Sequence, residues 1–126
     1  MEDDKNKYYV YIILCEDNSY YTGITNNLIN RFKKHQKGKG ANYTKFHKPM
    51  KFLSAWEVDN VNIALSIEYY IKSMDKKTKI LFTENNRLLK SYYTKEMKNK
   101  KNYKIKIRVR SISKKNIEKI NSILQN

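Results

Sequence analysis

The stretch that decides the fold is residues 8–25, YYVYIILCEDNSYYTGIT. Two runs rich in β-branched and aromatic residues flank the polar segment 15–18, and this pattern predicts a β-hairpin. A three-residue loop at 15–17 would pair Tyr11 with Tyr21. Because side chains alternate between the two faces of a strand, both phenols would then lie side by side on one face.

Gly23 follows Tyr21 by two residues and therefore shares its face of the strand. Because glycine has no side chain, the backbone of a ligand could approach the strand closely at this position. An ordinary half-buried hairpin explains the same residues, since tyrosine has a high β propensity. The hairpin alone therefore predicts the fold of this segment but not a function.

The next segment, residues 25–35 (TNNLINRFKKH), predicts a capped helix that Gly38 closes. Arg31 and His35 are four residues apart, so they would project from the same side of this helix. A guanidinium and an imidazole in this arrangement can converge on one phosphate. A basic pair on a solvated helix face is the simpler alternative.

A second helix is predicted over residues 61–74, where apolar side chains recur at helical spacing and Asp59 or Asn60 serves as the cap. Glu68 falls inside this apolar stripe. A buried carboxylate needs protonation, an ion pair or a metal to offset the loss of water. Mg²⁺ and Mn²⁺ suit such an oxygen ligand, because they keep several waters and use one or two protein carboxylates plus phosphate. A glutamate at the rim of the stripe, paired with a neighbouring lysine, is the alternative.

In order and spacing, these features resemble the GIY-YIG nuclease family. The two signatures appear as VYI at 10–12 and YTG at 21–23, and Arg31, His35 and Glu68 follow. The likeness runs from about residue 8 to 86.

The chain is also similar to the small single-domain bacterial branch of this family. The stretches that carry this likeness are GKGA at 38–41, YTK at 43–45 and ALSIEYYIK at 64–72. Two positions depart from the usual pattern, since Val10 replaces a glycine-containing pair and Thr22 replaces isoleucine or valine.

The resemblance implies an α+β fold, with a three-stranded antiparallel sheet flanked by helices. The residue patterns agree, because they predict strands at 8–14, 19–25 and 51–58 with helices after the second and third. A short helix is also expected over 76–82, and Pro49 marks the loop that enters the third strand.

The resemblance further implies cleavage of phosphodiester bonds with one divalent ion, Mg²⁺ or Mn²⁺. Glu68 would hold the metal, and Arg31 would stabilise the non-bridging oxygens of the phosphate. Tyr11 or Tyr21 would orient and deprotonate the attacking water, with His35 positioning it or relaying the proton. Tyrosine is an awkward base, since its pKa of about 10 would have to fall by about three units, or about 4 kcal/mol.

The loop after the first helix adds candidates for contact with nucleic acid. Tyr43 and Lys45 follow two glycines and could reach the nucleic-acid backbone, although Tyr43 is equally explained as an ordinary loop aromatic. His47 lies in the same loop and competes with His35 for the relay role.

The charge distribution divides the chain into a domain at 8–92 and a basic C-terminal extension at 93–126. The net charge of +15 over 126 residues points to a polyanionic partner, and the extension holds eleven of the 27 Lys and Arg residues against two glutamates. Residues 103–110 (YKIKIRVR) alternate apolar and basic side chains, which predicts a strand. An amphipathic helix is expected after Ser113.

The basic face of that strand has two interpretations. Lys104, Lys106, Arg108 and Arg110 could follow the phosphates of a nucleic acid. In the other interpretation, the strand lies at a sheet edge and its lysines prevent aggregation.

The predicted function is a metal-dependent endonuclease that acts on DNA, structured or single-stranded, in repair or nucleic-acid processing. RNA is the alternative substrate, and a catalytically inactive nucleic-acid-binding module of the same fold is the alternative function. A third hypothesis is an adapter for an acidic protein. One cysteine and no apolar run of about 18 residues indicate a cytoplasmic protein without a disulfide framework, a zinc cluster or a membrane partner.

Overall fold

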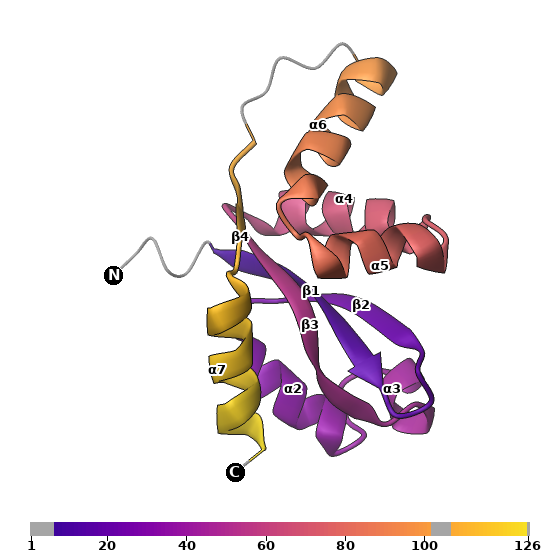
Figure 1. The fold of residues 1–126 in the computed structure, drawn as a ribbon, viewed down its shortest axis with the longest axis vertical. Helices are drawn as coiled ribbons and strands as arrows, with labels where there is room; N and C mark the ends of the chain where they lie inside the picture. The colour runs from indigo at the N-terminus through magenta and orange to yellow at the C-terminus, as the bar shows by residue number, and fades with distance from the viewer. Residues whose placement is uncertain (1–6, 102–106, 126) are drawn as a thin grey trace.

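The computed structural model describes residues 7–101 and 107–125. The strands of its sheet are β1 (Tyr8–Cys15), β2 (Tyr20–Thr25), β3 (Pro49–Val58) and β4 (Val109–Ser111). The helices of the described residues are α2 (Leu28–Gln36), α3 (Asn42–Phe46), α4 (Val61–Lys72), α5 (Lys76–Glu84), α6 (Leu88–Lys101) and α7 (Lys114–Leu124). Helices cover an antiparallel sheet (Figure 1), which confirms the predicted α+β class.

The sheet has four strands in the order β2-β1-β3-β4, so the predicted three-stranded sheet is wrong. The added strand comes from the C-terminal extension and pairs with β3, where Val109 lies opposite Val58. Val109 is buried there, so the apolar side of the alternating segment packs against the core. As described, the strand begins at Val109, and Lys104 and Lys106 of the predicted strand lie outside the described residues.

The register of the β1–β2 hairpin differs from the prediction by two residues. Tyr11 lies opposite Gly23 and not opposite Tyr21. The loop has the expected three residues but lies at 16–18, one position later than predicted, because the N–H of Cys15 donates to the carbonyl of Ser19. Asn18, the last residue of the loop, adopts a left-handed φ of 68°. A shift of two residues preserves the face on which a side chain lies. The rings of Tyr11 and Tyr21 therefore still meet, with their centroids 6.2 Å apart.

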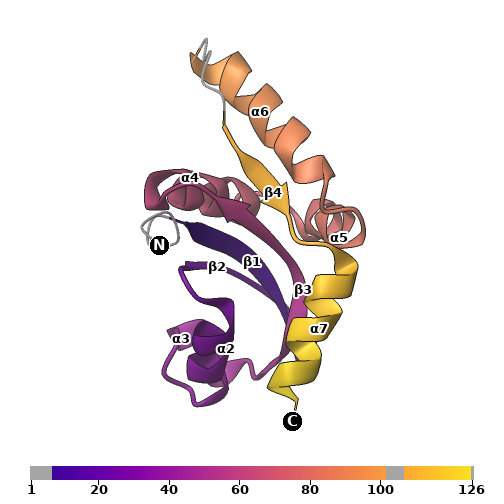
Figure 2. The ribbon, with the colours of Figure 1, turned by 90° about the vertical axis from the view of Figure 1, so that its left-hand side faces the viewer.

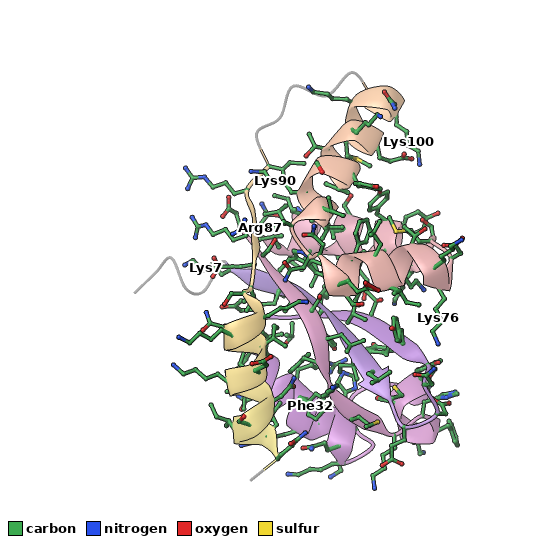
Figure 3. The ribbon with its side chains drawn as sticks, in the orientation of Figure 1. Lys7, Phe32, Lys76, Arg87, Lys90 and Lys100 are labelled. Atoms are coloured by element: carbon green, nitrogen blue, oxygen red, sulfur yellow. The ribbon has the colours of Figure 1, made fainter. Side chains whose placement is uncertain are left out.

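Two apolar layers lie on opposite faces of the sheet, as Figure 2 shows for α4 and α2. On one face, α4, α5 and α6 cover Ile12 and Trp56. On the other, α2 and α7 cover Tyr11 and Phe52. Basic side chains such as Lys76, Arg87 and Lys100 project from the outside of the molecule (Figure 3).

The predicted helices form where local capping signals begin them. The Asn27 side chain accepts a hydrogen bond from the N–H of Asn30 at the start of α2, and Asn60 caps α4 in the same way. The expected helix over 76–82 is present as α5. None of the helices in the described residues combines the length and the apolar character needed to cross a membrane.

The C-terminal helix docks on β3 through both polar and apolar contacts. Ser113 caps α7, as the sequence predicts, and Ile117 is buried. The Asn121 amide donates to the carbonyl of Phe52 and accepts from its N–H, each over 2.9 Å. The sequence did not predict α6, which runs across residues 92 and 93, and the division of the chain at that point stays a prediction.

Candidate active site

A directed chain of hydrogen bonds begins at Tyr11. Its hydroxyl lies 2.8 Å from His35 Nε2, and His35 Nδ1 lies 2.6 Å from the hydroxyl oxygen of Thr44. The Thr44 hydroxyl donates to the carbonyl of Ala41 over 3.2 Å. Because this bond uses the only proton of that hydroxyl, Thr44 accepts from the Nδ1–H of His35. Nε2 is then the acceptor for the Tyr11 hydroxyl, so the geometry assigns the neutral Nδ1–H tautomer.

Burial determines the protonation states of Tyr11 and His35 in this chain of hydrogen bonds. Burial, together with the Arg31 guanidinium, lowers the pKa of His35 to about 4. Burial also raises the pKa of Tyr11 well above its usual value, against the lowering effect of its hydrogen bond with Arg31. At neutral pH, His35 is therefore uncharged and Tyr11 is a neutral phenol.

The depressed pKa of His35 predicts a pH-dependent stability. The unfolded chain binds a proton on His35 near pH 6.5, whereas the folded protein binds it only near pH 4. The stabilisation is thus present above pH 6.5 and is lost as the pH falls to about 4, by about 3 kcal/mol at most. Urea denaturation between pH 7 and 4 should show this loss, and a His35→Gln variant should lack it. An NMR titration with a His35 midpoint near 6.5 would contradict the assignment.

Arg31 is held between the hairpin and the loop after α2. Its Nε donates to the Tyr11 hydroxyl over 3.4 Å, and its Nη2 donates to the carbonyl of Gly40 over 2.9 Å. Because a guanidinium has five N–H donors, this anchoring leaves donors for an incoming phosphate. Arg31 and His35 converge, as their helical spacing predicts.

Two glycines make room for the side chains of the site. A Cβ on Gly23 would lie 2.5 Å from the Tyr11 hydroxyl and 2.9 Å from Cε2 of Tyr21. A Cβ on Gly40 would lie 2.8 Å from Cε1 and Cγ of His35. The phenols of the protein itself therefore fill the space above Gly23, and the expectation that this space admits the backbone of a ligand is wrong.

Glu68 reaches the site from the other layer, because α4 packs on the edge strand β2. Its side chain is 20% exposed, and its Oε2 lies 3.4 Å from Nζ of Lys72, one helical turn later. The Lys72 ammonium in turn lies 5.8 Å from the centroid of the Tyr21 ring. The carboxylate is close enough to the phenols for its charge to raise the pKa of Tyr11. The ion pair expected for a rim position is thus present.

The donor set fits one type of metal site. Within residues 7–101 and 107–125, no group of three or more His, Cys, Asp or Glu side chains could enclose an ion. Glu68 offers a single carboxylate beside the phenols. This arrangement suits Mg²⁺ or Mn²⁺, which can take one protein carboxylate, several waters and a phosphate of the substrate.

An aromatic stack extends from the site along α3. Tyr43 stacks on Tyr21 with ring centroids 5.8 Å apart and on His47 with centroids 4.0 Å apart. His47 pairs with Asp17, so His35 and not His47 is the imidazole in contact with Tyr11. Lys45 is exposed beside Tyr43, with its ammonium 5.9 Å from the centroid of the Phe46 ring.

The described residues of the basic C-terminal strand lie elsewhere. Arg110 is on β4, at the opposite edge of the sheet from β2, and its Nη1 lies 3.0 Å from Oε2 of Glu57. Arg108 is exposed just before β4. With Lys104 and Lys106 outside the described residues, the role of all four in binding nucleic acid stays a prediction.

Sequence reasoning missed two residues of the site and did not name a third, the lysine that pairs with Glu68. Thr44 and Gly40 fall in stretches that resemble the family, yet their contacts with His35 depend on the conformation of the loop. Lys72 could have been found, because four residues separate it from Glu68 on a predicted helix.

The sequence is similar to a known family model and to several bacterial proteins. The family model described as GIY-YIG catalytic domain matches residues 7–85. The UPF0213 protein YazA of Bacillus subtilis is 39% identical over 84 residues, which are 67% of this chain and 85% of that protein. The UPF0213 protein YsiG of Lactococcus lactis is 38% identical over 104 residues, 80% of this chain and 99% of that protein.

A solved structure is also similar. The solution NMR structure of the UPF0213 protein BH0048 from Bacillus halodurans shares 36% sequence identity, over 62% of this chain and 83% of that one, with a TM-score of 0.42. The extent of the family match and the identity to YazA and YsiG show that this chain belongs to the GIY-YIG family.

Proposed function

We propose that this protein is a metal-dependent endonuclease that hydrolyses phosphodiester bonds in DNA. Membership of the GIY-YIG family supports a nuclease. The observation that carries the proposal is the hydrogen-bond chain from Tyr11 through His35 to Thr44. Arg31 donates to the same phenol, and Glu68 lies at the rim. These contacts support Tyr11 as the proton acceptor, Arg31 as the phosphate-binding cation and Glu68 as the metal-binding carboxylate.

The hydrogen-bond directions suggest how the attacking water loses its proton. Because the pKa of Tyr11 is raised, its phenol passes a proton on more readily than it ionises. As the hydroxyl oxygen of Tyr11 accepts a proton from the water, its own proton moves to Nε2 of His35. The Nδ1–H of His35 stays bonded to Thr44, which holds the ring in place while its charge develops. Tyr21 is more exposed than Tyr11 and can orient the water.

The charge that develops on the phosphate needs a separate partner. Arg31 can donate to the non-bridging oxygens, and its planar fork matches phosphate better than an ammonium does. A divalent ion held by Glu68 would supply charge neutralisation and assistance to the leaving oxygen.

A cleavage assay on labelled substrates tests the proposal. Single-stranded, duplex, flap and junction DNA and matching RNA would be incubated with Mg²⁺, Mn²⁺ or a chelator. We expect cleavage of DNA in the metal lanes and none with the chelator. Binding without cleavage on every substrate would contradict the nuclease and favour the inactive binding module. A competition assay tests the adapter hypothesis. If polynucleotide failed to displace a bound acidic protein, the adapter would be favoured.

A further inference from the structure

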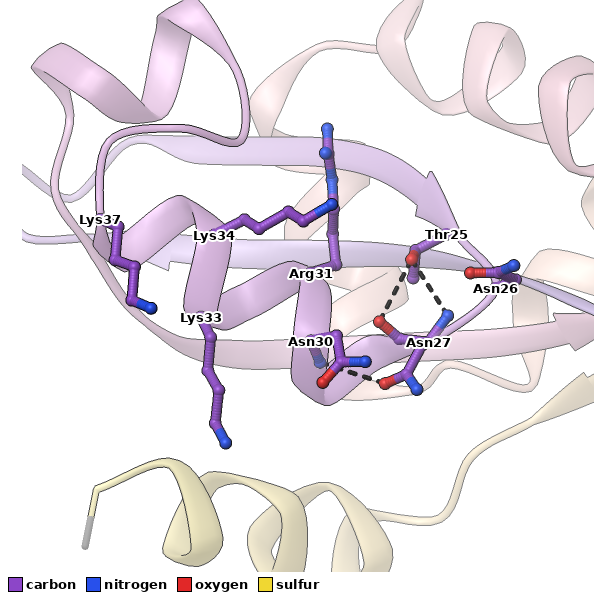
Figure 4. Close-up of a pocket in the computed structure, with 8 residues that line it drawn as sticks. All are labelled: Thr25, Asn26, Asn27, Asn30, Arg31, Lys33, Lys34 and Lys37. Atoms are coloured by element: carbon purple, nitrogen blue, oxygen red, sulfur yellow. Dashed lines mark hydrogen bonds between the residues drawn. The ribbon is translucent and has the colours of Figure 1, made fainter.

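A pocket of about 370 Å³, lined by polar and basic residues, lies on the outer side of α2, beside the turn from β2 (Figure 4). Asn26, Asn27 and Asn30 line its part near the start of the helix. The Asn27 side-chain oxygen is used to cap α2, which leaves its amide N–H groups to face a ligand. Amides of this kind commonly donate to phosphate and sugar oxygens in nucleic-acid complexes.

The rest of the lining is cationic. Lys33, Lys34 and Lys37 line the pocket with Arg31, and no acidic residue appears among its described lining residues. In the part of the chain that the structure describes, the ion pairs found reach none of these three lysines. All three lysines are exposed, and like charges one turn apart on a helix repel each other.

The helix dipole explains only part of this arrangement. Cations near the C-terminus of a helix gain about 0.3–1 kcal/mol from the dipole, which accounts for lysines in the last turn of α2. The dipole does not explain why α2 contains no acidic residue. It also does not explain why asparagines at the start of the helix line the same pocket as the lysines. A bound anion explains both, because it would neutralise the lysines and accept from the amides.

The position of the pocket indicates a polymeric anion. Arg31 lines the pocket and also donates to the Tyr11 hydroxyl, so the pocket adjoins the candidate active site. Arg31 and Lys33 point in opposite directions from α2 (Figure 4). The cations therefore lie on more than one side of α2 and are not gathered around one point.

We propose that this pocket binds the phosphodiester backbone of the substrate strand next to the scissile phosphate. The inference rests on the proposed function and adds the path of the substrate: Arg31 would bind the reacting phosphate, and Lys33, Lys34 and Lys37 would bind its neighbours. These contacts hold the backbone and read no base, so they would act alike on different sequences.

The salt dependence of binding tests this path. A triple variant, Lys33→Gln, Lys34→Gln and Lys37→Gln, would be compared with a control that changes Lys90, Lys95 and Lys98 of α6 to Gln. Both remove three exposed lysines, and glutamine has nearly the helix propensity of lysine. The two helices lie at opposite ends of the molecule (Figure 1). Fluorescence anisotropy with labelled DNA, in chelator to prevent cleavage, would give affinity against NaCl concentration.

We expect the α2 variant to lower the slope of log affinity against log salt by about two to three, because each phosphate contact contributes about 0.7–0.9. The α6 control should lower it by less than about one. Equal changes in the two variants would overturn the inference. Where the triple variant fails to fold, each single lysine variant should lower the slope by about one, and three unchanged slopes would likewise overturn it.

Cleavage by the same variants separates this inference from the proposed function. The α2 variant should raise KM by about tenfold with kcat nearly unchanged, because its lysines bind ground state and transition state alike. If the α2 variant cleaved DNA but kept the wild-type slope of log affinity against log salt, backbone binding in the pocket would be contradicted and the nuclease proposal would stand. If the wild-type protein cleaved no substrate but the α2 variant still lowered the slope, the nuclease proposal would be contradicted. Binding of a nucleic-acid backbone in the pocket would then stand on its own.

Discussion

Replacing Glu68 with glutamine is expected to slow metal-dependent cleavage by about 10³-fold or more, because a bound metal supplies several kcal/mol of charge stabilisation. Glutamine keeps the shape of the side chain but removes the negative charge. Affinity for DNA should not fall, since the variant is more positive than the wild type. Single-turnover cleavage and fluorescence anisotropy with labelled DNA would measure the two effects, and electron paramagnetic resonance would follow the loss of Mn²⁺ binding.

The chain offers a matched control for this change. Glu96 pairs with Lys100 over 3.1 Å at the same helical spacing as Glu68 with Lys72, but on α6. A Glu96→Gln variant loses an exposed ion pair worth about 0.3–0.5 kcal/mol and should cleave at the wild-type rate. If Glu68→Gln cleaved as fast as Glu96→Gln, Glu68 would not be the metal ligand.

Gly23→Ala is expected to reduce cleavage by about 100-fold, because the new methyl group must displace a phenol of the site. The Cβ would lie 2.5 Å from the Tyr11 hydroxyl and 2.7 Å from its Cζ, and both atoms belong to a side chain buried in the core. A displacement of about 1 Å in a reacting group costs about 100-fold in rate. Overpacking should also lower the free energy of unfolding by about 1–3 kcal/mol. Single-turnover kinetics and urea denaturation would measure the two effects.

Gly38 provides the comparison for this glycine. It has a φ of 72°, but a Cβ there would meet only Cγ of Lys45, at 3.8 Å. Asparagine tolerates the left-handed region well, so Gly38→Asn should keep nearly full activity. Equal losses in Gly23→Ala and Gly38→Asn would contradict the specific role of the contact between Gly23 and Tyr11.

Local signals made much of this fold predictable. Asparagine caps and apolar periodicity placed α2 and α4, and the helical spacing of Arg31 and His35 brought both to one side. The position of Glu68 within an apolar stripe predicted a partly buried carboxylate, which the structure shows paired with Lys72.

The features that depend on the path of a loop or on a distant partner were not predictable. Alternation of side chains fixes the face of a strand but not its register, so the two-residue shift at Asn18 left no trace in the pattern. The alternation at residues 103–110 predicted a strand but not its pairing with β3. Likewise, the contact of Thr44 with His35 forms only because the glycine-containing loop returns to α2.

The two hydrogen bonds between the Asn121 side chain and the Phe52 backbone affect how the protein can be shortened. The Phe52 ring meets the Tyr11 ring edge-on, with centroids 5.5 Å apart, and Ile117 of α7 belongs to the same apolar layer. A fragment cut back to the matched residues 7–85 would retain every residue that we assign to the chemistry. It would nevertheless lose the support behind Tyr11, and two backbone groups of β3 would lose their hydrogen bonds to Asn121. We therefore expect a fragment without α7 to be less stable than the full chain, although it keeps the residues proposed for the chemistry.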